Sequence, residues 1–249
     1  MNSARLSGKA MCDIDGLTAI ERVVESIRSS KLIDDVIITT TLESEDDVIE
    51  KLAINKGITF FRGDNKNIVK RFLDAAEKFN SDIIVRVTGD CPLVSYEISD
   101  YLINSHLNKN ADYTCIEVEK VPTGTYPEII SYSALKRLAG YKINFDYSEY
   151  LTFYFKNNQD IFAVNIAAAP EEYKFPEYRL TLDYEEDKKM FNALFKKIKE
   201  YKLSSSLSNI LLVLKKHPEI PQLNSHLTLK YRTNKELIKR INEATRRIL

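Results

Sequence analysis

The sequence predicts an α/β fold in which helices cover both faces of a mostly parallel sheet. Short runs of β-branched and apolar residues alternate with longer segments whose apolar residues recur at helical spacing. Single helices separate consecutive runs, which is the pattern of right-handed parallel crossovers. With 249 residues, 44% of them hydrophobic, the chain can bury the core that such a three-layer sandwich needs.

The first helix is expected from Thr18 to Ser29, because Thr18 and Glu21 have the spacing of a capping box. Apolar residues then recur on one helical face as far as Ile27. The β-branched run over 35–41 is typical of a buried strand. The same reasoning predicts, in chain order, a helix from Ser44, a strand over 58–61, a helix over 67–79 and a strand over 82–88.

After Leu93 the pattern changes, and a helix over 95–107 leads to two strand-like runs at 112–118 and 127–131. These runs predict added strands or a protruding hairpin. Pro127 favours an edge position for the second run, since proline cannot donate a ladder hydrogen bond. The remaining expected elements are helices over 147–156 and 184–201, a strand over 161–166, and two helices from Ser206 onward.

We therefore expect an α/β domain over residues 1–203, with a 112–131 hairpin insertion, and a helical C-terminal appendage over 204–249. Basic and acidic residues number 36 each, so no overall basic field favours a nucleic-acid partner. No apolar run approaches the roughly 18 residues that span a bilayer. The three cysteines share no metal-ligand spacing, which is typical of free thiols. We expect a cytoplasmic protein with neither a membrane nor a nucleic-acid partner.

Two aspartates are candidate metal ligands. The strand that ends in Arg86-Val-Thr-Gly-Asp-Cys-Pro-Leu93 presents Asp90 just past its C-terminal end, where ligands bind in open α/β sheets. A carboxylate there suits Mg²⁺, which combines a few carboxylate oxygens with substrate phosphates and water. The alternative is that Asp90 caps the helix near Ser95. Asp183 has the same two interpretations, because Glu186 gives it the form of a capping box.

A basic loop, Ser3-Ala-Arg5-Leu-Ser-Gly8-Lys9, is the candidate phosphate site. Its backbone N–H groups and two cations can neutralise phosphate oxygens, although a solvated connection is the simpler alternative. Arg86 could reach a substrate carboxylate or phosphate from its strand end, or it could be an exposed arginine. Taken with the two aspartates, the loop suggests a site for a nucleoside triphosphate and a divalent cation.

Four segments in register resemble the cytidylyltransferase family, which includes the CMP-acylneuraminate and CMP-Kdo synthetases, and especially its spore-coat polysaccharide synthesis F branch. The segments are Ser3 to Lys9, Phe61-Arg62-Gly63 with Arg71, Val85 to Leu93, and Leu180 to Asp187. The resemblance covers nearly the whole chain. It implies a Rossmann-like sheet of the nucleotide-diphospho-sugar transferase, or GT-A, type. It also implies Mg²⁺-dependent transfer of CMP from CTP to a small acidic sugar, with release of pyrophosphate, in surface polysaccharide or glycan biosynthesis.

The resemblance also assigns roles to individual residues. It implies that the metal is held by Asp90 and Asp183, and that the catalytic residues are Arg5, Lys9, Asp90 and Asp183. The implied nucleotide-binding residues are Ser3, Arg5, Gly8, Lys9, Arg71, Thr88 and Asp90. The implied acceptor-binding residues are Arg86, Glu128 and Arg179. Members of the family are commonly dimers, so a homodimer through the 112–131 hairpin is a candidate assembly.

Family members begin with a strand that precedes the basic loop, whereas this sequence opens at Met1. We therefore expect the start to be an internal methionine, and the fold otherwise to lack its first strand. An N-terminally truncated inactive paralogue or nucleotide-binding partner subunit is the alternative function. A GT-A-type glycosyltransferase is a second alternative, because Asp13-Ile14-Asp15 has the form of an Asp-X-Asp metal motif. A turn with Asx hydrogen bonds explains that segment more simply.

Overall fold

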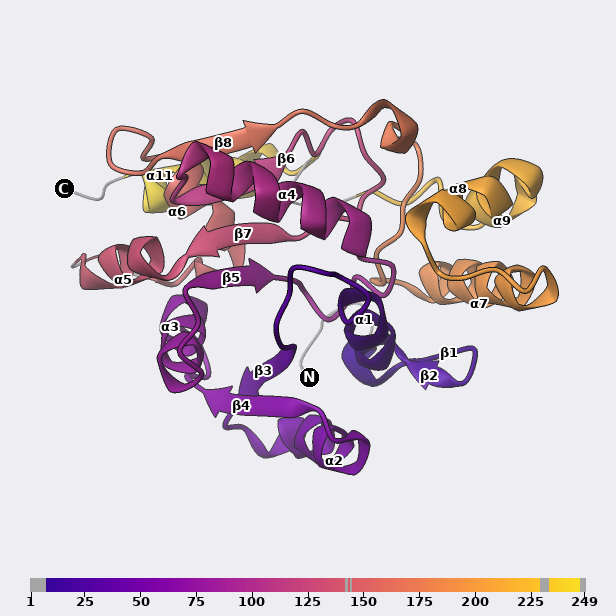
Figure 1. Ribbon diagram of the computed structural model, residues 1–249, viewed down its shortest axis with the longest axis horizontal. Coiled ribbons are helices and arrows are strands. Elements are labelled where there is room, and N and C mark those ends of the chain that lie inside the picture. Colours follow the sequence, from indigo (N-terminus) through magenta and orange to yellow (C-terminus); the bar gives the residue numbers. More distant parts are fainter. Residues whose placement is uncertain (1–7, 142, 144, 229–232, 247–249) are drawn as a thin grey trace.

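The computed structural model describes residues 8–141, 143, 145–228 and 233–246, and it confirms the α/β class (Figure 1). The strands form a parallel pair and a larger sheet with the order β5-β7-β6-β8. The parallel pair is β3 (Ile37–Thr41) with β4 (Thr59–Gly63). The larger sheet consists of β5 (Ile83–Arg86), β7 (Glu128–Ser131), β6 (Tyr113–Ile116) and β8 (Val164–Ala167).

The strand β7 runs antiparallel to both of its neighbours, while β6 and β8 are parallel. The prediction that the 127–131 run occupies a sheet edge is therefore wrong, because β7 lies between β5 and β6. Pro127 is tolerated because it immediately precedes the first strand residue, Glu128, and so removes no donor from the ladder. The two strands of the expected hairpin thus belong to the main sheet and do not protrude from it.

Helices α3 (Ile68–Lys78), α5 (Tyr132–Gly140) and α6 (Leu151–Lys156) cover one face of this sheet. Their apolar residues pack with Ile130 of β7. Helices α4 (Tyr96–Lys109) and α8 (Leu207–Lys216) cover the other face, where they pack with Ile129. Adjacent residues of one strand point to opposite faces, so this pair of isoleucines serves two separate cores.

The smaller sheet has its own helical cover. Helices α1 (Ala19–Ile27) and α2 (Asp47–Lys56) pack on Ile38 of β3. The capping box of Thr18 and Glu21 is present, as predicted, and begins α1. A short antiparallel hairpin of β1 (Asp13–Ile14) and β2 (Leu17–Thr18) precedes that helix. The 3-10 turns of the described chain are η1 (Lys9–Met11), η2 (Ser44–Asp46), η3 (Ser148–Tyr150) and η4 (Glu171–Tyr173).

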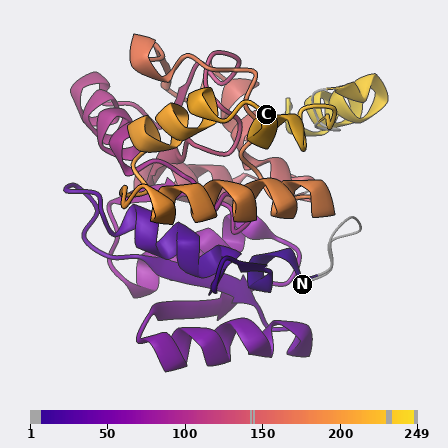
Figure 2. The ribbon, with the colours of Figure 1, turned by 90° about the vertical axis from the view of Figure 1, so that its right-hand side faces the viewer.

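The C-terminal helices lie beside the sheet domain (Figure 2). Helix α7 (Glu185–Glu200) packs along α8 and against α9 (Glu219–Gln222), and α11 (Lys235–Thr245) contacts α6. Residues of α8 also join the core beneath α4. The domain boundary at residue 203 stays a prediction. None of the described helices is long and apolar enough to cross a membrane.

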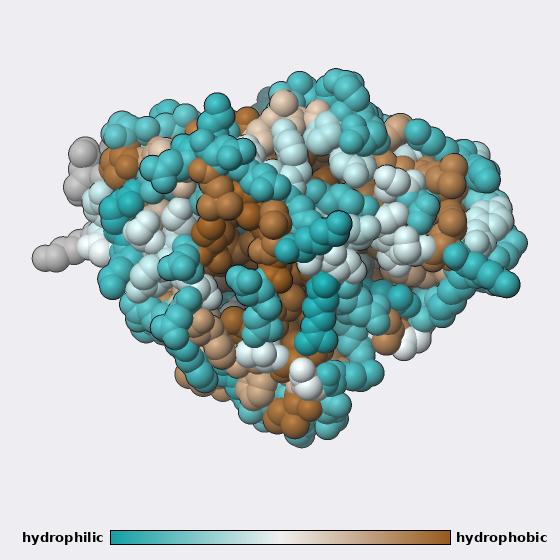
Figure 3. Space-filling model, in the orientation of Figure 1, coloured by the Kyte–Doolittle hydropathy of each residue, from teal (hydrophilic) through white to brown (hydrophobic). Residues whose placement is uncertain are grey.

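Apart from the β1–β2 hairpin, the β structure of the described residues is in two parts, because β3 and β5 each pair with a single strand. On the face seen in Figure 3, hydrophobic side chains gather in a band near the centre of the molecule. The strand expected upstream of Met1 lies outside the printed sequence and stays a prediction.

Candidate functional site

Asp90 lies in the turn that follows β5, at the C-terminal end of that strand. The turn is closed by a hydrogen bond from the Cys91 N–H to the Thr88 carbonyl, 3.1 Å. The Thr88 hydroxyl donates to Asp90 Oδ1 at 2.5 Å and orients the carboxylate. The N-cap of α4 is Ser95, whose hydroxyl accepts from the Ile98 N–H at 3.1 Å. Asp90 is therefore not the helix cap, and its second carboxylate oxygen is directed elsewhere.

Asp183 is held beside Asp90 by backbone contacts of the segment that leads to it. The Leu182 N–H donates to the Asp90 carbonyl at 2.8 Å, and the Thr181 hydroxyl donates to the same oxygen at 3.2 Å. These hydrogen bonds join the turn after β5 to the entry of α7. The two aspartates, which are distant in the sequence, thereby become neighbours.

A glycine allows a second attachment of the same segment. The Leu180 N–H donates to the Thr123 carbonyl at 2.8 Å, directly before Gly124. Gly124 has a φ of +92°, and a Cβ at this position would lie 2.2 Å from the Leu180 carbonyl oxygen. Only glycine lets the two backbones approach this closely. The position of Asp183 therefore depends on this contact as well.

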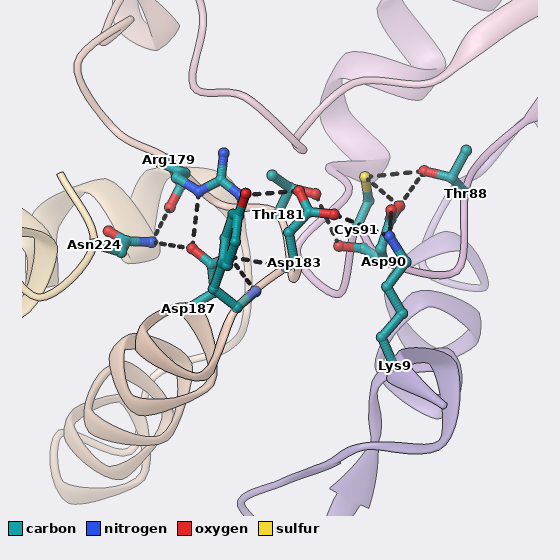
Figure 4. A network of polar contacts seen from close by, with 10 residues as sticks. Lys9, Thr88, Asp90, Cys91, Arg179, Thr181, Asp183, Asp187 and Asn224 are labelled. Atoms are coloured by element: carbon teal, nitrogen blue, oxygen red, sulfur yellow. Dashed lines mark hydrogen bonds and ion pairs between the residues drawn. The ribbon is translucent and has the colours of Figure 1, made fainter. Parts of the chain in front are cut away.

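Lys9 lies between the two carboxylates (Figure 4). Its ammonium is 2.5 Å from Asp90 Oδ2 and 3.0 Å from Asp183 Oδ1. Gly8, in the left-handed conformation with φ 65°, precedes the 3-10 turn that begins at Lys9. The Lys9 and Asp90 side chains are about one-fifth exposed, at 22% and 21%, whereas Asp183 is 5% exposed. The site therefore opens to solvent on the side of Lys9 and Asp90.

A buried network holds Asp183 from behind. The Arg179 guanidinium donates to Asp183 Oδ2 at 2.9 Å and to both oxygens of Asp187, at 2.9 and 3.1 Å. Asp187 also accepts from the Asp183 and Tyr184 N–H groups, at 2.8 and 3.0 Å. Asn224 donates to Asp187 at 2.9 Å and to the Arg179 carbonyl at 3.0 Å. This network fixes one oxygen of Asp183 and leaves the other facing Asp90.

This geometry corrects one local prediction and identifies residues that the sequence did not. The carboxylate that reaches back to the start of α7 is that of Asp187, one position beyond the expected Glu186. The spacing of Asp187 from Tyr184 was visible in the sequence, but tyrosine is not a typical N-cap residue. Thr181 and Asn224 carried no comparable signal, because their roles depend on contacts with distant segments.

The charges at the site stabilise one another. Burial by itself raises the pKa of the Asp90 carboxyl, but the Lys9 ammonium and the Thr88 hydroxyl hold that pKa below its ordinary value. Burial by itself lowers the pKa of Lys9, but the two carboxylates hold it above its ordinary value. The site therefore presents an ionised Asp90 and a protonated Lys9 at neutral pH.

The donor set fits a hard divalent cation. Two carboxylate oxygens already converge on a single positive group, so they are no farther apart than the sum of their distances to Lys9 Nζ. Within the described residues no cluster of three or more His, Cys, Asp or Glu side chains could hold a metal. Two carboxylates with open positions for phosphate oxygens and water are the arrangement that Mg²⁺ uses with nucleotide substrates.

A second cluster surrounds the end of β5. Arg86 faces Glu128 across the antiparallel ladder and forms an ion pair with it. Glu128 also accepts from the Tyr113 hydroxyl at 2.5 Å, and Tyr113 contacts the Thr152 hydroxyl. Burial by itself raises the pKa of Glu128, but Arg86 and these hydroxyls hold it below its ordinary value. The ion pair with Glu128 thus holds Arg86 beside the turn that carries Asp90.

The structure therefore divides the predicted site residues into three groups. Ser3 and Arg5 lie outside the described residues. The network around the two aspartates unites Lys9, Thr88, Asp90, Arg179 and Asp183, with Gly8 preceding the lysine. The cluster at the end of β5 contains Arg86 and Glu128, and the pKa of Arg71 is lowered by burial, with a smaller contribution in the same direction from the nearby Arg86 charge. Each residue's role toward substrate stays a prediction, and Arg179, 7% exposed, positions Asp183.

The Asp-X-Asp segment of the glycosyltransferase alternative lies in the β1–β2 hairpin. Asp13 Oδ1 accepts from the Gly16 N–H at 3.4 Å, and Asp15 forms an ion pair with Lys199 at 2.6 Å. These contacts are those of a tight turn that rests on α7, as the simpler interpretation predicted.

The fold and the site define a nucleotidyltransferase with a Rossmann-like sheet. A solved cytidylyltransferase from Leptospira borgpetersenii superposes with a TM-score of 0.80 at 31% identity, covering 92% of this chain and 94% of that one. The family model for cytidylyltransferases matches residues 1–225. The chain belongs to the cytidylyltransferase family, which confirms the resemblance recognised in the sequence.

Two relatives of known name match this chain over different lengths. The spore coat polysaccharide biosynthesis protein SpsF of Bacillus subtilis is 30% identical over 224 residues, which are 88% of this chain and 92% of that protein. The 3-deoxy-manno-octulosonate cytidylyltransferase of Pelobacter propionicus is 33% identical over 107 residues, which are 43% of this chain and 41% of that enzyme. The first similarity extends over almost the whole chain, and the second is confined to part of it.

Proposed function

We propose that this protein transfers CMP from CTP to a hydroxyl group of a small acidic sugar and releases pyrophosphate. The observation that carries the proposal is the convergence of Asp90 and Asp183 on one cation position, at the end of β5, in a member of the cytidylyltransferase family. The partial similarity to an enzyme that is named for an octulosonate supports an acidic acceptor. The similarity to SpsF supports a role in polysaccharide biosynthesis.

In the proposed reaction the acceptor hydroxyl gives its proton to water and its oxygen attacks the α-phosphorus. The bond from this phosphorus to the oxygen that bridges it to the β-phosphorus breaks, and pyrophosphate leaves. Asp90 and Asp183 would hold Mg²⁺, which supplies charge neutralisation for the triphosphate when it is bound. Thr88 and Arg179 keep the two carboxylates oriented. Lys9 supplies a positive charge for the departing pyrophosphate. The chain itself contributes orientation and electrostatics and forms no covalent intermediate.

The second cluster supports an anionic acceptor. The Nε–H groups of Arg71 and Arg86 are buried and have no hydrogen-bond partner among the described residues. Buried donors without partners are rare in folded proteins. We assign the Arg86 guanidinium, whose side chain keeps 13% exposure, to a substrate carboxylate, and Arg71 stays assigned to the nucleotide. Glu128 keeps Arg86 in place for that contact.

Pyrophosphate release tests this proposal. The protein is incubated with Mg²⁺, each of the four nucleoside triphosphates and a panel of ulosonic and nonulosonic acids. We expect release with CTP and one acidic sugar, and loss of more than about 99% of the rate in Asp90→Asn, because the metal loses a charged ligand. Asp13→Asn, in the hairpin, is the matched control and retains the rate.

Three results would contradict the proposal. Near-native turnover of folded Asp90→Asn would show that the reaction does not need a metal bound by the Asp90 carboxylate. If CTP binds but no pyrophosphate is released with any acceptor of the panel, the result supports a partner subunit that performs no transfer. Stabilisation by a nucleotide sugar in preference to CTP supports a glycosyltransferase.

A further inference from the structure

Lys9 occupies the position between the two carboxylates that the proposed metal needs. The ammonium contacts Asp90 Oδ2 and Asp183 Oδ1, which are the oxygens that face each other. The opposite oxygens are already engaged, Asp90 Oδ1 by Thr88 and Asp183 Oδ2 by Arg179. A cation placed between the two facing oxygens would therefore compete with Lys9 for them.

From this geometry we infer that Lys9 is a built-in competitor of the metal: its ammonium neutralises Asp90 and Asp183 in the metal-free protein and leaves them when the divalent cation binds. This inference rests on the proposed function, because it takes the two aspartates to be the metal ligands. It assigns Lys9 a positioning role before catalysis, in addition to its predicted contact with the triphosphate.

Among the described residues, Lys9 and Arg179 are the cations that contact Asp183, and they differ in mobility. Arg179 is 7% exposed and is held by both oxygens of Asp187, so it cannot leave. Lys9 is 22% exposed and reaches the site from a short 3-10 turn, on a flexible side chain. Of these two cations, Lys9 is therefore the one that can exchange with an incoming cation. Arg179 remains and keeps its ion pair with Asp183.

The exchange between Lys9 and the metal follows from the charges at the site. Without a cation, Asp90 and the 5% exposed Asp183 would face each other as like charges at a poorly solvated position, which is unfavourable. Lys9 removes this cost in the resting protein but weakens the binding of a metal alone. When nucleotide and metal arrive together, the displaced ammonium finds phosphate oxygens as new partners. The lysine thereby makes metal binding dependent on nucleotide.

Metal binding without nucleotide tests the inference, with Mn²⁺ as the probe and the electron paramagnetic resonance signal of free Mn²⁺ as the readout. At pH 8 we expect Lys9→Met to bind Mn²⁺ about tenfold more tightly than the wild-type chain, because one competing charge is gone. Lys70→Met, which removes an exposed ion pair with Asp74 on α3, is the matched control and leaves the affinity unchanged.

A second measurement uses the wild-type chain, so it does not depend on how the variant folds. Lysine acetylation by a water-soluble acylating reagent is followed by peptide mass spectrometry, with and without Mg²⁺. We expect the acetylation rate of Lys9 to rise about threefold or more when Mg²⁺ is added, since a free amine reacts faster than a paired ammonium. The rate of Lys70 does not change.

The inference is overturned if Lys9→Met binds Mn²⁺ no more tightly than the wild-type chain does. It is also overturned if the acetylation rate of Lys9 is the same with and without bound Mg²⁺. Either result leaves the proposed metal role intact if Asp90→Asn still abolishes Mn²⁺ binding. If neither the wild-type chain nor Lys9→Met binds Mn²⁺, with or without a non-hydrolysable CTP analogue, the inference and the metal role fail together.

Discussion

Replacement of Asp187 by asparagine tests the buried network most directly. The Asp187 side chain is 0% exposed and accepts hydrogen bonds from Arg179, Asn224 and the backbone N–H groups of residues 183 and 184. Asparagine keeps the shape but replaces one accepting oxygen with an amide that only donates. Arg179 also loses half of its negative partners while it stays buried.

The expected cost follows from this loss. Removing one partner of a buried ion pair typically costs about 3–5 kcal/mol of unfolding free energy, much more than a surface pair contributes. For a chain of this size the corresponding fall in melting temperature is roughly 6 to 20 °C. Because Asp187 also holds the Asp183 N–H, we expect Mn²⁺ affinity in Asp187→Asn to fall as well.

Urea unfolding followed by circular dichroism measures the effect, with linear extrapolation to zero denaturant. Glu185→Gln is the matched control, since Glu185 lies in the same first turn of α7 but is exposed. We expect this control to stay within about 0.5 kcal/mol of the wild-type chain. A loss below about 1 kcal/mol for Asp187→Asn would refute the reasoning, because it would mean that Arg179 finds other compensation.

Three further predictions concern other parts of the molecule. Gly124→Ala should lose at least about 2 kcal/mol of unfolding free energy, since its Cβ meets the Leu180 carbonyl, whereas Gly140→Ala, with open space around it, should stay within about 1 kcal/mol; equal losses would contradict this. Burial lowers the pKa of His106, so the unfolded chain binds more protons and the unfolding free energy falls as pH drops from 7 through about 6.5. Urea titrations between pH 7 and 5.5 should show that the unfolding free energy of His106→Gln changes less with pH than that of the wild-type chain. An equal change in both would exclude His106 as its source. Arg86→Met should raise the acceptor KM about tenfold or more and the CTP KM little, and steady-state kinetics showing the reverse would place Arg86 on the nucleotide.

Local patterns predicted the elements well. The capping box of Thr18 and Glu21 begins α1, and Asn67 and Ser95 cap α3 and α4 near the expected starts. These signals are reliable because the cap and its helix lie within one turn of sequence. Local patterns did not predict the order of the strands in the sheet as well. The expectation of an edge position for Pro127 failed because a proline that immediately precedes the first strand residue removes no ladder donor and is compatible with an interior strand.

In the candidate site, too, local sequence patterns predicted some features, and others became visible only in the fold. Asp90 and Asp183 were identified because one follows a strand end and the other precedes a long helix, and both positions are visible in the sequence. The sequence did not reveal that Leu182 and Thr181 bind the Asp90 carbonyl. Hydrogen bonds between segments so distant along the chain leave no periodic pattern.

By itself the sequence determined the α/β class, the helices with their caps, and the acidic and basic residue types that the proposed chemistry needs. Only the tertiary structure decided that Lys9 lies between the two aspartates and that Asp187, itself bonded to Asn224, holds the Asp183 backbone. The physical reason is range: capping and periodicity act over a few residues, whereas burial brings charges together only after the chain has folded.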